Sequence, residues 1–75
     1  MPCIRADGSL TVAAKKVMTA MEKPATLDEV AAASGLPLYQ IRSSVRELVE
    51  AGLVEIRDGA YVMTDAGRRK LAEQR

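Results

Sequence analysis

Residues 26–53 constrain the fold of this chain more than any other stretch of its sequence. Thr26 is followed three residues later by Glu29, the spacing of a capping box at the start of a helix. Gly35 can end that helix in the left-handed conformation, and Pro37 can open another, because its missing N–H costs nothing in the first turn. The pattern predicts two helices across a tight turn, at 26–34 and 37–51. In such a helix-turn-helix pair, the second helix can enter a DNA major groove.

The second of these helices has one apolar face and one polar face. At about 100° per residue, five apolar side chains fall within an arc of about 100° that we expect to face the core: Leu38, Ile41, Val45, Leu48 and Val49. The neighbouring arc carries side chains that can hydrogen-bond to base edges and phosphates, and Glu50 lies on the same arc at the C-terminal end of the helix. With the adjacent Gln40, the candidate DNA-binding residues are Tyr39, Gln40, Arg42, Ser43 and Arg46. The alternative is an ordinary solvated helix face, on which arginine and glutamate are common.

A β-hairpin is predicted directly after these helices, at 53–63. Asp58-Gly59 lies between two short apolar runs and is a strong signal for a two-residue turn. The resulting register pairs 54 with 63 and 57 with 60, and we expect one face of the hairpin to pack on the helices: Val54, Ile56, Tyr61 and Met63. The other face carries Glu55, Arg57, Ala60 and Val62. Arg57, near the tip, is the remaining candidate DNA-binding residue.

The two ends of the chain complete the predicted fold. A first helix is expected at 9–22, with Leu10, Ala14 and Val17 on its apolar face and Val12 among its polar residues. A last helix begins near residue 65, where Gly67 permits a close approach to the hairpin. The prediction is a single α+β, mainly α domain over residues 1–75, a winged helix with a three-helix core, a two-stranded wing and a C-terminal helix. Residues 1–8 are expected to be loosely held.

Three segments resemble winged helix-turn-helix proteins of the bacterial and archaeal regulator type: LDEVAAASGLP, IRSSVRELVEAGLVE and MTDAGRRKLAE. The last is similar to the "L-T-x-x-G-r-x-x-L" ending of MarR-like regulators, with Met63 in the usual leucine position. The wing is shorter than in those proteins, and a similar short-winged domain ends the DprA-type DNA-processing proteins. The resemblance implies a winged helix that binds double-stranded DNA and regulates transcription.

The net charge of +1 is low for a protein that binds DNA. Neutralising phosphates supplies much of the affinity of DNA-binding modules, and many of them are plainly basic. We therefore expect a homodimer, which doubles the phosphate contacts, joined through the first helix, the last helix or both. Val12 and the segment Met18–Met21 offer apolar surface for such pairing. The low charge also leaves open a second function, a protein–protein interaction module with weak or no DNA binding.

Other functional classes find little support in the sequence. The chain contains no histidine and one cysteine, Cys3, so we expect no zinc site, no other metal site, no cofactor and no catalytic residues. The glycines do not form a phosphate-binding loop. No apolar run approaches the roughly 18 residues of a membrane span. These observations predict a cytoplasmic protein that is not an enzyme.

Overall fold

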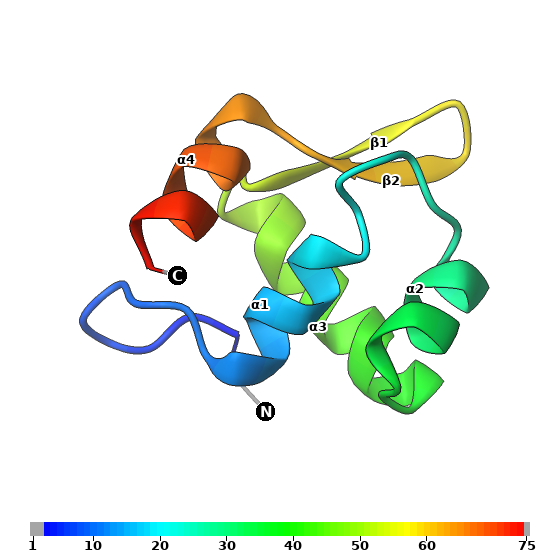
Figure 1. Ribbon diagram of the computed structural model, residues 1–75, viewed down its shortest axis with the longest axis horizontal. Coiled ribbons are helices and arrows are strands. Elements are labelled where there is room, and N and C mark those ends of the chain that lie inside the picture. Colours follow the sequence, from blue (N-terminus) through cyan, green and yellow to red (C-terminus); the bar gives the residue numbers. More distant parts are fainter. Residues whose placement is uncertain (1–2, 75) are drawn as a thin grey trace.

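The computed structural model describes residues 3–74, with four helices and one hairpin among them (Figure 1). In chain order these are α1 (Val12–Thr19), α2 (Leu27–Ser34), α3 (Leu38–Glu50), β1 (Val54–Arg57), β2 (Ala60–Met63) and α4 (Asp65–Glu73). The first three helices pack together, the hairpin extends along one side of them, and α4 lies beside the base of the hairpin (Figure 1). This order confirms the predicted winged helix.

The helix-turn-helix pair forms as its sequence pattern predicts. The Thr26 hydroxyl accepts a hydrogen bond from the Glu29 backbone N–H at 3.2 Å, and the Glu29 carboxylate accepts one from the Thr26 N–H at 2.9 Å. Gly35 ends α2 with a φ of 73°. Pro37 lies just before the first residue of α3, so both helices begin and end within one residue of the predicted bounds.

The first helix is shorter than predicted at both ends. It begins at Val12 because Leu10 is extended and pairs with Ile4, and because the Thr11 hydroxyl caps the helix by accepting from the Ala14 N–H at 3.2 Å. It ends at Thr19 rather than at 22. The following linker turns and runs alongside β2, where Ala25 pairs with Tyr61.

The Asp58-Gly59 turn and the register of the hairpin are as predicted. Asp58 has a φ of 52° and Gly59 a φ of 79°, and positive φ at both central residues is the signature of a type I′ turn. Val54 lies opposite Met63, and Arg57 opposite Ala60. The wing is also fastened to the linker between α1 and α2, since two backbone hydrogen bonds of 2.9 and 2.8 Å join Ala25 and Tyr61.

The prediction of which hairpin residues are buried was partly wrong. Val54 and Met63 are buried, but Ile56 is 60% exposed and Tyr61 is half-buried. Val62, on the face predicted to be outward, is only 5% exposed. The outer part of the hairpin lies beside the linker between α1 and α2 and not directly against a helix (Figure 1). Val62 lies at the base, in a hollow whose walls include Arg57 and Arg68.

The last helix is held close to the start of the hairpin. The Thr64 hydroxyl accepts a hydrogen bond from the Gly67 N–H at 3.0 Å and donates one to the Gly52 carbonyl at 2.7 Å. A Cβ placed on Gly67 would lie 2.0 Å from the Leu53 carbonyl oxygen. Glycine is therefore required for this approach, as predicted, and Leu71 is buried against the core.

The N-terminal segment is more ordered than predicted. Residues 1–2 lie outside the described residues, but Cys3 is 1% exposed and belongs to the hydrophobic core. Its backbone N–H donates to both carboxylate oxygens of Glu47, at 3.1 Å each, and its carbonyl accepts from the Thr11 N–H at 2.9 Å. A side chain of α3 thus supplies partners for Cys3 and Ile4 that the local sequence does not reveal, while the expectation of a loosely held segment stays a prediction for the exposed residues 5–7.

Candidate nucleic-acid interface

The polar side of α3 forms one continuous exposed surface. Tyr39 is 77% exposed, and Arg42, Ser43 and Arg46 are exposed as well. Residues three and four apart are neighbours on a helix, so these four side chains adjoin one another over two turns. We call these four residues the exposed α3 face. Gln40, the other candidate on this helix, is half-buried at its edge.

The opposite side of α3 faces the core and fixes the orientation of the helix. The buried residues are Ile41, Ser44, Val45 and Leu48, whereas Leu38 and Val49 are only half-buried. The core stripe is therefore slightly rotated from the predicted one and includes a serine. Because this stripe is anchored, the exposed α3 face has a fixed direction relative to the rest of the domain.

The two arginines of the exposed α3 face are not used by the fold. Within residues 3–74, neither Arg42 nor Arg46 forms a hydrogen bond or an ion pair. Their guanidinium groups lie one helical turn apart and remain available to an external acceptor. A guanidinium group presents several N–H donors in a planar fork that fits a phosphate or the acceptor edge of a guanine.

Arg57 lies in a different environment. It forms an ion pair with Glu55, two residues earlier on the same strand, and both side chains are largely in solvent. The carboxylate offsets the positive charge of the guanidinium group. The wing therefore presents less positive potential than Arg57 alone would suggest.

Two residues behind the exposed α3 face were not singled out from the sequence. Glu47 binds the backbone N–H groups of Cys3 and Ile4, and Ser44 is 1% exposed. Burial raises the pKa of the Cys3 thiol, while a hydrogen bond with Ser44 acts in the opposite direction. These contacts fasten the N-terminal segment to α3. No local signal could have identified Glu47, because its partner is far away in sequence.

The basic residues of α4 do not form a continuous strip. Arg68 donates to the Glu22 carbonyl at 2.8 Å and so ties α4 to the linker after α1, whereas Arg69 is exposed and Lys70 is half-buried.

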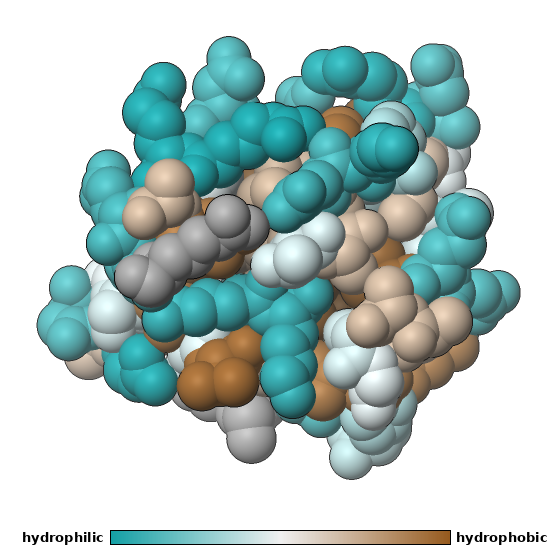
Figure 2. Space-filling view, viewed as in Figure 1, coloured by the Kyte–Doolittle hydropathy of each residue, from teal (hydrophilic) through white to brown (hydrophobic). Residues whose placement is uncertain are grey.

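In Figure 2, hydrophilic residues predominate over the upper and left parts of the face, and apolar residues are visible between them lower down.

Other kinds of site lack the necessary groups in the described part of the chain. No three histidine, cysteine, aspartate or glutamate residues among residues 3–74 lie where they could hold a metal ion. Within the same residues, no helix has both the length and the apolar character needed to cross a membrane.

A family model described as "Sugar-specific transcriptional regulator TrmB" matches residues 15–68, which extend from α1 into α4. The chain belongs to the TrmB family. Its winged helix-turn-helix is therefore that of a transcriptional regulator and not of an enzyme, as the sequence predicted. The matched region contains all of α3 and the wing.

One solved structure supports the fold of this TrmB-family chain. It is that of Bordetella bronchiseptica BpsR, a protein whose DNA binding is regulated by 6-hydroxynicotinic acid. The two chains superpose with a TM-score of 0.82 at 22% sequence identity, over 91% of the present chain and 54% of BpsR. The chain thus spans about half the length of that regulator, and the likeness concerns the fold alone. No curated protein matches the chain significantly.

Proposed function

We propose that this TrmB-family chain binds double-stranded DNA through the exposed α3 face, with Arg42 and Arg46 supplying the larger part of the affinity. The observation that carries the proposal is that these two guanidinium groups are exposed, adjacent and without partners among residues 3–74. Membership of a transcriptional regulator family supports the same partner. A protein that binds chromosomal DNA in this way would act in the cytoplasm.

The remaining candidates have supporting roles in this proposal. Tyr39 and Ser43 flank the arginines and can donate or accept hydrogen bonds at base edges, so they would tune sequence preference, together with Gln40 at the edge. Arg57 would contact the phosphate backbone of the DNA beside the groove. It would contribute less to the affinity than the α3 arginines do, because Glu55 is paired with it.

The proposal includes a homodimer. A chain with a net charge of +1 gains from presenting two recognition helices to one site. Half-sites for such dimers lie about 34 Å apart, one turn of DNA, and the domain measures 29 Å along its longest axis. The domain is shorter than that spacing, so two copies fit on neighbouring half-sites. Val12, at the start of α1, is 63% exposed and offers apolar surface for the contact, whereas Met18 and Met21, which were also expected to do so, are fully buried.

The test compares the Arg42→Ala/Arg46→Ala double variant with the wild-type chain. Fluorescence anisotropy with a labelled mixed-sequence duplex at low ionic strength gives the affinity, and circular dichroism establishes that the variant is folded. We expect a loss of about tenfold or more, because each arginine that contacts a base or phosphate contributes on the order of 1 kcal/mol or more.

Arg69→Ala is the matched control, since Arg69 is exposed on α4, outside the exposed α3 face. It should retain wild-type affinity. Unchanged affinity in a folded double variant would refute the assignment of the interface. Absence of wild-type binding at low ionic strength would favour a protein-binding module instead.

A further inference from the structure

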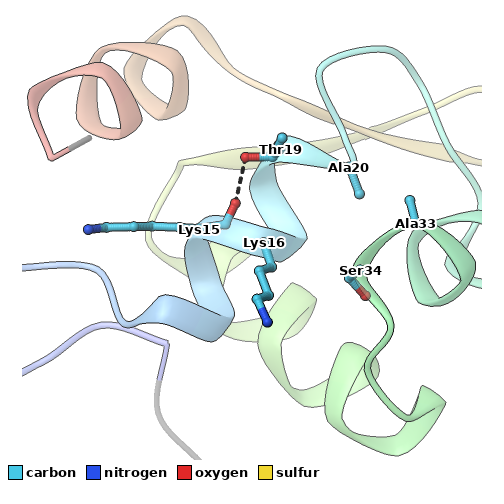
Figure 3. A pocket seen from close by; sticks show the side chains of 6 residues that line it. All are labelled: Lys15, Lys16, Thr19, Ala20, Ala33 and Ser34. Carbon is cyan, nitrogen blue, oxygen red and sulfur yellow. Dashed lines mark hydrogen bonds between the residues drawn. The ribbon is translucent and has the colours of Figure 1, made fainter.

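A hollow of about 450 Å³ lies between α1 and α2, apart from the exposed α3 face (Figure 3). We call it the α1–α2 hollow, and the residues that line it are Lys15, Lys16, Thr19, Ala20, Ala33 and Ser34. Its volume falls within the range of about 300–1,000 Å³ that is usual for small-molecule sites. Nothing in the proposed DNA contact uses these residues.

The inner surface of the α1–α2 hollow is mostly apolar. Ala20 follows α1, Ala33 belongs to α2, and Figure 3 shows their methyl groups pointing toward one another across the gap. No aromatic side chain lines the hollow, so stacking is not available there. A ligand with an apolar body would gain affinity from this surface, and that body need not be flat.

The edge of the hollow is positively charged. Two lysines line it and no acidic residue does, and neither lysine forms an ion pair within residues 3–74. In Figure 3, the Lys16 ammonium group extends toward the side of the hollow on which Ser34 lies, while Lys15 extends away from it. Lys16 is therefore the cation that an occupant would meet first.

The two hydroxyl groups of the hollow differ in availability. The Thr19 hydroxyl donates to the Lys15 carbonyl at 2.7 Å, a strong hydrogen bond that uses its only proton. The Ser34 hydroxyl donates to the Ala31 carbonyl at 3.5 Å, at the limit of a hydrogen bond, so its proton can turn toward a better acceptor. The donors that an acceptor in the hollow can recruit are thus the Lys16 ammonium group and, by turning from its long hydrogen bond to Ala31, the Ser34 hydroxyl.

We propose that the α1–α2 hollow binds a small organic carboxylate. Its apolar body lies over Ala20 and Ala33, and its carboxylate accepts hydrogen bonds from Lys16 and Ser34. The Ser34 hydroxyl also accepts from the Leu36 N–H at 3.3 Å, in the turn that leads into α3. An occupant would therefore lie beside the turn that leads into α3, away from the exposed α3 face.

The test uses the whole chain without DNA, so its outcome is independent of the proposed DNA interface. Amide chemical shifts of the labelled protein are followed by NMR during titration with cyclohexanecarboxylate, with its neutral amide, and with inorganic phosphate. We expect saturable shifts from the carboxylate with a dissociation constant of about a millimolar, as for a ligand of this size. The shifts should be confined to the second half of α1 and residues 33–38.

The variants Lys16→Gln and Lys23→Ala separate the contribution of the hollow from that of general charge. Lys16→Gln should weaken carboxylate binding about threefold to fivefold, the usual range for a solvent-exposed ion pair. Lys23 is exposed and does not line the hollow, so its variant should bind as the wild type does. Ala33→Leu should fill the hollow and abolish the shifts.

Four results would overturn the proposal. If the neutral amide bound as tightly as the carboxylate, the Lys16 ammonium group would not contribute to binding. If phosphate bound as tightly, the apolar surface would not contribute. An equal effect of Lys16→Gln and Lys23→Ala would leave only long-range attraction. Shifts that lie elsewhere in the domain, or none at all, would remove the site.

Discussion

A single missing methyl group sets the distance between α4 and the segment before β1. Gly67 lies in the first turn of α4 directly against the Leu53 carbonyl, and the Thr64 cap holds it there. Backbone atoms form both sides of this contact, so no side chain can move aside to make room. The position of α4 thus depends on residue 67 having no Cβ.

Gly67→Ala should destabilise the domain by about 1–3 kcal/mol, because the added Cβ forces a backbone shift in a packed region. Helix propensity alone predicts the opposite, a gain of about 1 kcal/mol. Urea unfolding measures the free energy. Ala66→Gly, at an exposed neighbouring position, measures how much an exchange between alanine and glycine changes stability through helix propensity alone. A Gly67→Ala variant more stable than the wild type would contradict the close approach.

Sequence patterns predicted individual residues well where the controlling partner is close along the chain. The capping box of Thr26 and Glu29 and the turn at Asp58-Gly59 involve neighbours, and both formed as predicted. Ile56 and Val62 behaved differently from their alternation pattern. Alternation assigns residues to the two faces of a strand but does not say which part of a hairpin a helix covers.

At the scale of elements, α3 is held from two sides. Its apolar stripe packs into the core, and Glu47 binds the N-terminal segment on another side of the helix. The apolar stripe could be predicted because it has helical periodicity. The contact of Glu47 could not be predicted, because most glutamates on the side of a helix face solvent. Its partners, Cys3 and Ile4, are also distant in sequence.

Glu47→Ala should lower the free energy of unfolding by about 2 kcal/mol, since hydrogen bonds to a charged group contribute roughly 1.5–3 kcal/mol. Hydrogen exchange should also quicken at the Cys3 and Ile4 amides, which lose their acceptor. Glu50→Ala is the control, because Glu50 is exposed on the same helix. Equal losses in the two variants would show that the carboxylate does not fasten the segment.

At the scale of the whole molecule, charge and size bear on the assembly. The chain is nearly neutral and its described core contains no phenylalanine or tryptophan, so both DNA affinity and burial would gain from pairing. The exposed Val12 on α1 gives the proposed dimer an apolar contact. The exposed side of α3 could be predicted because it follows from the periodicity of the helix, whereas an interface between chains has no local signal.

Sedimentation at micromolar concentration should show a species of about twice the 8.1 kDa of one chain, which dissociates on dilution. Val12→Lys should shift that equilibrium toward the monomer. Ile56→Lys is the matched control, since Ile56 is 60% exposed but lies on the wing. A single monomeric species at all concentrations would rule out a homodimer formed by the free protein.

The most direct test of the central claim, that α3 binds DNA through Arg42 and Arg46, is the salt dependence of DNA binding. The logarithm of the association constant falls with the logarithm of salt concentration, by about 0.9 for each phosphate neutralised. We expect a clear negative slope for the wild-type chain. If both arginines contact phosphates, the slope of Arg42→Ala/Arg46→Ala should be less steep by about 1.8 for each chain bound. An unchanged affinity and slope in the folded double variant would contradict the account.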